Sequence, residues 1–258
     1  MEGTQQAYKI KSVGNESSGS AFRKYRDLYY GDTSLAHVLV CELITTLFSW
    51  IPGALGLVLR KALYPLMFRQ VGRGVVFGRG ITLRHAHKIT LGDRVIIDDH
   101  VVLDAKGNTN QGIQIGHQVY LGRNTIVYTK NGDIILGDEV NLSSNCQIFS
   151  SNRLEIGAQT VIGAFTYLLS GGEYDYHDRT PFSRQSGMNT RGPLTVGPNC
   201  WLGAGITVTD HASIGEHCVI GAGAVVCSPI PENSIAVGVP AKVIQQLKPH
   251  DESQAHLD

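Results

Sequence analysis

The stretch that decides the fold is LTVGPNCWLGAGITVTDHASIGEHCVIGAGAVV, which runs from Leu194 to Val226. Within it an aliphatic residue returns at every sixth position, at Val196, Leu202, Val208, Ile214, Ile220 and Val226. A helix repeats every 3.6 residues and a strand every 2, so neither element alone gives a period of six. The pattern therefore predicts short strands joined by turns.

The same rhythm extends back to about Val76, in units such as LGDRVI, IGHQVY, LGDEVN and IGAQTV. Three six-residue units separate Val196 from Ile214, so these two residues should stack in successive turns of a coil. Earlier members of this column are Leu91, Ile115, Leu136 and Ile156, which follow one another at somewhat longer gaps, so short loops should interrupt the coil there. We expect three-sided turns, stacked at ~4.8 Å, with the aliphatic residues inside.

A long loop should also interrupt this coil. The gap between Ile156 and Val196 is more than twice the three units that one turn needs. We therefore expect a β-helix domain over 71–246 with an excursion loop near 170–193. Cys200 and Cys218 are three units apart and should stack inside as packed thiols, not as metal ligands.

Composition narrows the classes of function. The chain has 258 residues, of which 42% are hydrophobic, and it carries 22 basic and 22 acidic residues. The balanced charge gives no support to nucleic-acid binding. Its five cysteines include no C-x-x-C pair, which is typical of reduced, buried thiols in a cytoplasmic protein. The N-terminus lacks the apolar core of a signal peptide.

The N-terminal segment, 1–70, should differ from the coil. Residues 1–20 are polar and predict a loose start. Two amphipathic helices should follow, separated by a break at Pro52-Gly53, and the second should end or kink at Pro65. In the first helix one face carries Leu and Val and the opposite face carries Ser34, His37, Cys41, Thr45 and Ser49. A transmembrane hairpin is not expected, because His37, Glu42 and the Pro-Gly break interrupt the apolar run. The pattern leaves open whether 34–68 cap the coil or contact a membrane surface through nearby basic residues. Residues 247–258 should form a polar tail.

The elements CWLGAGITV, CVIGAGAVV and IPENSIAVGVPAKVI, together with the repeated rhythm, resemble the hexapeptide-repeat acyltransferases. The resemblance covers about 76–246 and is closest to sugar O-acetyltransferases of the maltose and galactoside type and of polysaccharide clusters. It implies an all-β fold, the left-handed parallel β-helix, although the general rule for parallel crossovers gives the other hand. It also implies a homotrimer in which a long loop reaches the neighbouring subunit and the active sites lie between subunits.

The excursion SGGEYDYHDRTPFSRQSGMNTRGP contains one histidine, His177, and Trp201 follows it two dozen positions later. The family's catalytic histidine lies at about this distance before its W-x-G-x-G element. Acyl transfer to a hydroxyl needs a base, and free imidazole, with a pKa near ~6.5, suits that task. The resemblance implies that His177 is the base for direct transfer of acetyl from acetyl-CoA to a sugar or glycolipid precursor. The alternative is a surface histidine in a polar loop. Glu173, Asp175 and Asp178 all remain candidates for orienting the ring.

The resemblance also places coenzyme A along the coil. The implied cofactor-binding residues are Trp201, Gly203, Ala204, Gly221, Ala222 and Lys242. The N–H groups of Ala204 and Ala222 would meet the pantetheine arm, with the glycines allowing close approach, and Lys242 would face the phosphates.

Two positions depart from the family pattern. Ser228 stands where relatives commonly have lysine, and Gln245 where they often have a basic residue. Losing two of three positive charges should weaken binding of a phosphate-rich cofactor unless Arg184 or Arg191 compensates.

Several rival functions stay open. An N-acyltransferase for amino sugars or a serine acetyltransferase would use the same base. A non-catalytic scaffold is favoured by the two missing cations. A γ-class carbonic anhydrase would need two of its three zinc-binding histidines five positions apart, but Gly122 stands five positions after His117.

His85 and His87 flank Ala86, and a solvated edge explains them better than a metal pair. We therefore expect no metal.

Overall fold

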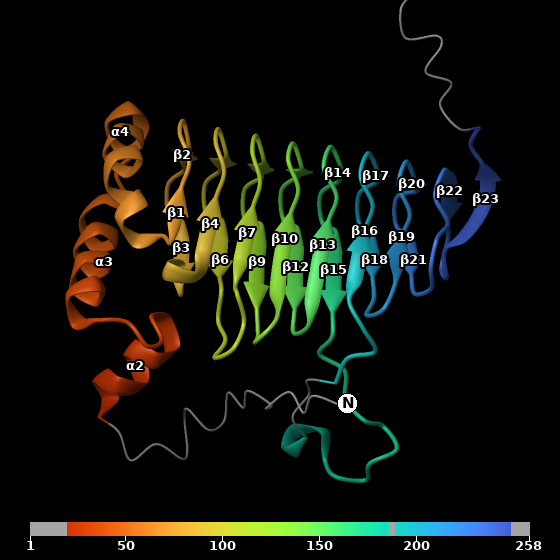
Figure 1. Ribbon diagram of the computed structural model, residues 1–258, viewed down its shortest axis with the longest axis horizontal. Coiled ribbons are helices and arrows are strands. Elements are labelled where there is room, and N and C mark those ends of the chain that lie inside the picture. Colours follow the sequence, from red (N-terminus) through yellow and green to blue (C-terminus); the bar gives the residue numbers. More distant parts are fainter. Residues whose placement is uncertain (1–19, 186–188, 249–258) are drawn as a thin grey trace, which may run out of the picture.

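The computed structural model describes residues 20–185 and 189–248 (Figure 1). The chain winds into a three-sided coil, and each side is a sheet of short strands stacked along the coil axis. Every pairing between strands of successive turns is parallel. This is the left-handed parallel β-helix that the family resemblance implies.

The strands alternate among the three sheets in chain order. The first sheet holds β1 (Gln70–Val71), β4 (Ile89–Leu91), β7 (Ile113–Ile115), β10 (Asp133–Leu136), β13 (Arg153–Ile156), β16 (Leu194–Val196) and β19 (Ser213–Ile214). The second holds β2 (Val76–Phe77), β5 (Ile96–Ile97), β8 (Tyr120–Leu121), β11 (Asn141–Leu142), β14 (Val161–Ile162), β17 (Trp201–Leu202), β20 (Val219–Ile220), β22 (Ser234–Val237) and β23 (Lys242–Gln246). The third holds β3 (Thr82–Arg84), β6 (Val102–Asp104), β9 (Ile126–Thr129), β12 (Gln147–Ser150), β15 (Tyr167–Ser170), β18 (Thr207–Val208) and β21 (Val225–Val226).

The predicted aliphatic column is confirmed. Leu136 pairs with Ile115 on one side and Ile156 on the other, and Ile156 pairs with Val196 across the long gap. All members of the column are at most 3% exposed. Burial of these side chains, at roughly 25 cal/mol per Å² of apolar surface, is the main force that holds the turns together.

The predicted thiol stack is also confirmed. Cys200 and Cys218 are 2% and 0% exposed and lie on successive turns of the second sheet. Burial raises the pKa of Cys200 to about 11, so it is a packed, unreactive thiol. Cys227 differs from the buried arrangement expected of the cysteines, because it follows the inward-facing Val226 and is exposed.

The corners of the coil require unusual backbone. Within the described ranges, many corner residues other than glycine have φ between 52° and 65°, among them Asn124, Asn145, Asn199 and Asn233. Asparagine tolerates this left-handed region better than most residues. Gly203 is needed for a different reason, since a Cβ there would lie 2.7 Å from the backbone N of Ala222 on the next turn.

Helices cover the N-terminal end of the coil: α2 (Ala21–Tyr29), α3 (Leu35–Phe48), α4 (Gly53–Leu63) and the short 3-10 helix η1 (Tyr64–Met67) (Figure 1). Two more 3-10 turns, η2 (Ala86–Lys88) and η3 (Phe182–Arg184), lie within the coil domain. The sequence did not predict α2. Its first turn is closed by the Ser20 hydroxyl, which accepts from the N–H of Arg23 at 3.4 Å.

The faces of α3 point in directions opposite to those usual for a surface helix of a globular protein. The residues expected on one face do share it, but this face turns inward, with Cys41 buried beside Val38 and Ile44. The Leu-rich face points to solvent, with Leu39 69% exposed. Among the described residues no helix is both long and apolar enough to cross a bilayer.

Arg60 joins the helices to the first turn of the coil. Its guanidinium is 1% exposed and donates to three backbone carbonyls, those of Phe77 at 3.0 Å, Phe48 at 3.2 Å and Ile51 at 2.8 Å. The carbonyl of Phe48 belongs to the C-terminal end of α3, where a cation is favoured by the helix dipole. At the opposite end of the coil, β23 pairs antiparallel with β22 and covers the last turn.

Candidate active site

The predicted excursion loop is present. The chain leaves the coil after β15 and returns at β16, at the corner between the third and first sheets. Glu173 and Asn189 form an antiparallel bridge at the neck of the loop. Figure 1 shows the loop projecting from the lower edge of the coil.

Asp210 anchors both ends of this loop to the coil. Its carboxylate is 1% exposed and accepts from the N–H of Gly171 at 2.6 Å, where the loop begins. The same carboxylate accepts from the N–H of Arg191 at 2.6 Å and the hydroxyl of Thr190 at 3.2 Å, where the loop ends. Hydrogen bonds to a buried charge are among the stronger ones in proteins, so the neck of the loop is fixed.

Gln185 organises the interior of the loop. Its side-chain oxygen accepts from the N–H of Asp175 at 3.0 Å. Its amide nitrogen donates to the carbonyls of Asp175, Asp178 and Thr180 at 3.0, 3.3 and 2.8 Å. One side chain therefore ties together the segment that carries the histidine.

His177 lies at the exposed tip of this segment. Its backbone N–H donates to Oδ1 of Asp175 at 2.8 Å, and its ring lies 4.3 Å from the ring of Tyr176. Within the described ranges, no hydrogen bond or ion pair engages the imidazole. A loop that is fixed at its neck and interior thus presents a free imidazole to its surroundings.

The three neighbouring carboxylates have other partners in a single chain. Glu173 pairs with Arg191 at 2.7 Å, and Asp175 accepts backbone N–H groups. A hydrogen bond from the N–H of Thr180 holds the pKa of Asp178 below its usual value. None of the three contacts the His177 ring in the chain as described, so the choice among them stays a prediction.

The residues implied for coenzyme A gather at another corner, between the second and third sheets. Trp201 on β17 is 62% exposed and pairs with Val161 and Val219 on the adjacent turns. Ala204 and Ala222 follow at equivalent positions of successive turns. Neither alanine N–H donates to a group in the described chain, and both alanines are exposed, so this corner carries two backbone donors without an acceptor.

The glycines at this corner fall into two groups. The absent Cβ of Gly203 and Gly221 faces the next turn of the coil, where it would meet Ala222 and Val237. Stacking alone therefore explains these two glycines. Gly205 and Gly223, which the sequence analysis did not single out, have φ of 70° and 71° and open space where a Cβ would be. They leave the outside of this corner without side chains. We call the surface formed by 203–205 and 221–223 the bare corner.

Lys242 lies one turn beyond this corner. It is exposed on β23 and pairs in register with Val237, which packs over Gly221. The sequence-predicted residues thus form two groups: His177 on the excursion and the remaining six around the bare corner and the last turn. No hydrogen bond, ion pair or ring contact joins the two groups within the described chain, because they lie at different corners of the prism.

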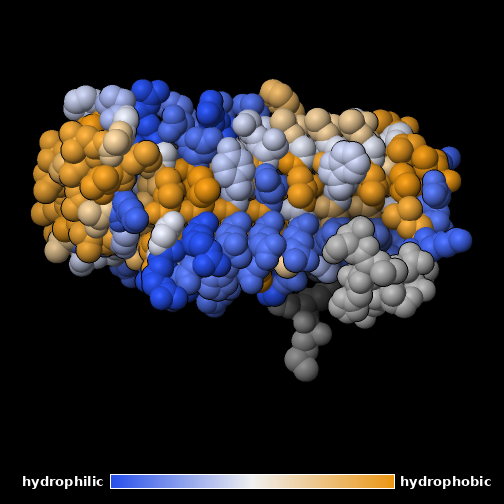
Figure 2. All heavy atoms as spheres, turned by 90° about the horizontal axis from the view of Figure 1, so that it is seen from above, coloured by the Kyte–Doolittle hydropathy of each residue, from blue (hydrophilic) through white to orange (hydrophobic). Residues whose placement is uncertain are grey.

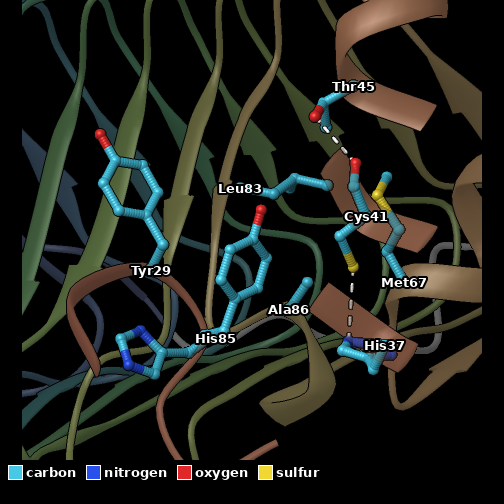
Figure 3. A pocket seen from close by; sticks show the side chains of 9 residues that line it. Tyr29, His37, Cys41, Thr45, Met67, Leu83, His85 and Ala86 are labelled. Atoms are coloured by element: carbon cyan, nitrogen blue, oxygen red, sulfur yellow. Dashed lines mark hydrogen bonds between the residues drawn. The ribbon is translucent and has the colours of Figure 1, made fainter. Parts of the chain in front are cut away.

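The prediction of a solvated edge for His85 and His87 is wrong. β3 ends at Arg84, and His85, with φ of 52°, turns the chain into η2 beneath the N-terminal helices, where it is 3% exposed. Burial lowers the pKa of His87 to about 4. Together with residues of α3, His85 lines a cavity of about 20 Å³, roughly the size of one water (Figure 3). No cluster of three potential metal ligands occurs in the described part of the chain.

Asp210 and Gln185 are the residues that sequence reasoning missed. Asp210 occupies a position two residues before the inward Ala212 in an otherwise ordinary repeat, TDHASI. In the sequence it could have been noticed only as an acidic residue one turn of the coil after the point where the long loop was expected to begin. Gln185 gave no signal, because its partners are backbone groups whose positions the sequence does not specify.

Comparison with known proteins agrees with this architecture. Residues 193–228 match the family described as bacterial transferase hexapeptide (six repeats). The chain is 30% identical over 135 residues to the putative colanic acid biosynthesis acetyltransferase WcaF of Escherichia coli, an alignment that covers 52% of this chain and 70% of WcaF. The chain belongs to the hexapeptide-repeat transferase family.

Two further comparisons differ in the share of each chain that is covered. The probable acetyltransferase Rv3034c of Mycobacterium tuberculosis is 31% identical over 63% of this chain and 53% of its own length. The chain spans about half the length of the curated relatives that it matches first. Among solved structures, AntD, an N-acyltransferase from Bacillus cereus in complex with dTDP and coenzyme A, has a TM-score of 0.52 at 20% identity, over 73% of this chain and 90% of AntD. At that identity the likeness shows the fold alone.

Proposed function

We propose that this protein is an acetyltransferase that moves an acetyl group from acetyl-CoA to a hydroxyl of a sugar or glycolipid precursor, with His177 as general base. One observation carries the proposal: a buried carboxylate, Asp210, fixes the neck of a long loop whose tip presents a free imidazole. Long ordered loops in compact domains usually serve a function. The names of WcaF and Rv3034c as acetyltransferases support the class of reaction.

The chemistry needs little more than this imidazole and a backbone donor. His177 removes the proton of the acceptor hydroxyl as its oxygen attacks the thioester carbonyl. The negative charge that develops on the carbonyl oxygen is stabilised by a nearby N–H. His177 then returns the proton to the departing sulfur, which leaves free coenzyme A and an O-acetyl ester. No acyl-enzyme is formed.

The bare corner fits coenzyme A. The N–H groups of Ala204 and Ala222, which have no acceptor in the described chain, would pair with the amide groups of its pantetheine arm, and Trp201 would pack beside that arm. Lys242 would contact the phosphates. Coenzyme A is a substrate here, and the four cysteine thiols buried in the core take no part in the reaction.

We further propose a homotrimer, because His177 and the bare corner belong to different edges of one chain. A neighbouring copy would bring its own corner to the loop, and the site would lie between subunits. Mixing two impaired variants, assayed with acetyl-CoA below its Kd, tests this arrangement. His177→Ala combined with Trp201→Ala/Lys242→Ala should regain part of the activity in mixed trimers, whereas sites contained within one chain would regain none.

The main test is a release assay for the coenzyme A thiol with a panel of sugar, amino-sugar and serine acceptors. His177→Ala should keep the fold and lower turnover by on the order of 10²–10⁴, while His100→Ala, at an exposed position far from the excursion, should keep the parent rate. An unchanged rate in His177→Ala would refute the assignment. Preference for an amine acceptor would instead establish N-acylation, and absence of coenzyme A binding at millimolar concentration would establish a scaffold.

We also propose that the enzyme works in a reducing compartment such as the cytoplasm. All five cysteines lie in the described part of the chain and are free. Disulfides are rare where thiols are kept reduced.

A further inference from the structure

The outward face of the N-terminal helices is apolar. On α3 the residues Leu35, Leu39, Leu43 and Leu47 are 55%, 69%, 61% and 47% exposed. They recur at every fourth position and so form one stripe along the helix. A helix on the surface of a globular protein normally turns such a stripe toward the core, yet here the inward face holds His37, Cys41 and Thr45 (Figure 3).

The stripe continues onto α4. Trp50, Leu55 and Val58 are each about two-thirds exposed, and Leu66 follows at 61%. Figure 2 shows the hydrophobic residues gathered over this end of the molecule. We call this surface the cap face; its residues are Leu35, Leu39, Val40, Leu43, Leu47, Trp50, Leu55, Leu57, Val58 and Leu66. Contiguous apolar surfaces of this kind mark interaction sites.

The segment that carries most of the cap face is basic in sequence. Residues 43–92 contain seven basic residues and no acidic one, although the whole chain is balanced. Lys61, Arg69 and Arg79 are exposed, and in the described ranges their side chains make no ion pair. The nearest acid in the sequence, Glu42, is occupied by the hydroxyls of Tyr25 and Tyr30. Basic side chains therefore outnumber acidic ones beside the apolar surface, although Asp99 lies next to Leu57 and Arg79.

We propose that the cap face docks on the surface of an anionic lipid bilayer, with α3 and α4 lying in the interface. An apolar helix face, flanking cations and an exposed tryptophan are the features that bind such a surface. A second copy of this chain, placed end to end, would bring two predominantly basic edges together, which is unfavourable. Residues 1–19 contain too few apolar side chains to cover ten large ones. In a cyclic trimer, three cap faces would lie on the same side of the assembly and bind together.

The first test is flotation with vesicles. The full chain should bind phosphatidylcholine vesicles that contain phosphatidylglycerol, and binding should fall when NaCl is raised from about 50 to 500 mM. Leu39→Ser/Leu43→Ser should reduce the partition at least ten-fold without changing the circular dichroism. Ile244→Ser, an equally exposed apolar residue at the other end of the coil, should bind as the parent does. Lys61→Gln/Arg69→Gln should lose only the part of binding that depends on anionic lipid.

The second test uses the two tryptophans. Trp201→Phe leaves Trp50 as the single reporter, and brominated lipids should quench its fluorescence. Trp50→Phe leaves Trp201, which should not be quenched. The proposal is overturned if vesicles fail to bind, if the serine variant binds like the parent, or if Trp50 stays unquenched. It is also overturned if, without lipid, the parent sediments at twice the mass of the serine variant, because the cap face then pairs with a second copy.

Discussion

The backbone N–H of Arg191 donates to the carboxylate of Asp210 at 2.6 Å, from the far end of the excursion to the coil. Because the same carboxylate also holds Gly171, the two ends of the excursion are bound to one buried group on the coil. Both ends of the loop are thus held to the solenoid by one side chain, and the position of His177 depends on Asp210 although no contact joins the two side chains.

Replacing Asp210 should therefore loosen the loop before it affects the coil. Asp210→Ala leaves the N–H groups of Gly171 and Arg191 without their acceptor, at a cost of about 2–4 kcal/mol in the free energy of unfolding. Turnover should fall about 10–100-fold, and trypsin should cut at Arg179 and Arg184 at least ten-fold faster. The measurements are chemical denaturation, limited proteolysis and the thiol-release assay.

Asp133 provides the matched control for this prediction. Its carboxylate accepts from the N–H groups of Gln111 and Gly112 at 2.7 and 2.9 Å, so it pins a different loop in the same way. Asp133→Ala should lose comparable stability but leave trypsin cleavage within the excursion unchanged. Equal acceleration by both variants would mean that general destabilisation, and not the anchor, exposes the loop.

Coenzyme A binding should respond to charge at three positions. Lys242→Ala should raise the Kd for coenzyme A about five-fold, since one charged contact to phosphate is worth roughly 1 kcal/mol at the surface. Introducing Ser228→Lys and Gln245→Lys should tighten binding by a similar factor and make it more sensitive to salt. Calorimetry at low and high NaCl measures both effects. If neither variant alters the Kd, the phosphates bind elsewhere on the coil.

The sequence predicted the parts of the structure that repeat. The spacing of Ile156 and Val196 predicted both the stacking of their turns and the length of the loop between them, because each inward residue must meet its equivalent one turn later. The same spacing singled out His177 as the one histidine in the insertion, but its role as base, which the resemblance implies, stays a prediction. These predictions succeed because each six-residue unit has its own hydrophobic pattern, and the same pattern recurs from one unit to the next along the coil.

The parts that do not repeat were not predictable. The burial of His85 depends on helices that close over it from much earlier in the chain. Gln185 acts on carbonyls whose directions only the folded loop defines. The sequence correctly predicted which residues of α3 share a face. It did not predict which face packs against the coil, because hydrophobic periodicity defines the faces of a helix but not the one that is buried.

Arg60 should be the main attachment between the helices and the coil. Arg60→Met leaves the carbonyls of Phe48, Ile51 and Phe77 without their donor, and we expect a loss of about 3 kcal/mol. Arg60→Lys should recover only part of it, because an ammonium does not match the planar, forked donor of arginine. Hydrogen exchange should show the loss concentrated in 35–63, while the aliphatic column near Ile156 stays protected. Uniform loss of protection would show that the helices and the coil unfold as one unit.

His87 should make the stability of this same region depend on pH. Burial lowers its pKa to about 4, and the neighbouring charges of His85 and Lys88 act in the same direction. In the unfolded chain the pKa is about 6.5, so below that pH the unfolded state binds the proton more readily than the folded state. The stabilisation is complete above about pH 6.5 and is lost as the pH falls to about 4, by roughly 3 kcal/mol in total.

Urea unfolding at pH 7.5, 6.0 and 5.0 measures this dependence. His87→Gln cannot take up the proton, so its unfolding free energy should decline less over the same range, and the difference between variant and parent should shrink steadily toward pH 5. His100→Gln, at an exposed position, should decline as the parent does. If the parent and His87→Gln decline in parallel, the buried imidazole is not the group whose protonation destabilises the N-terminal helices.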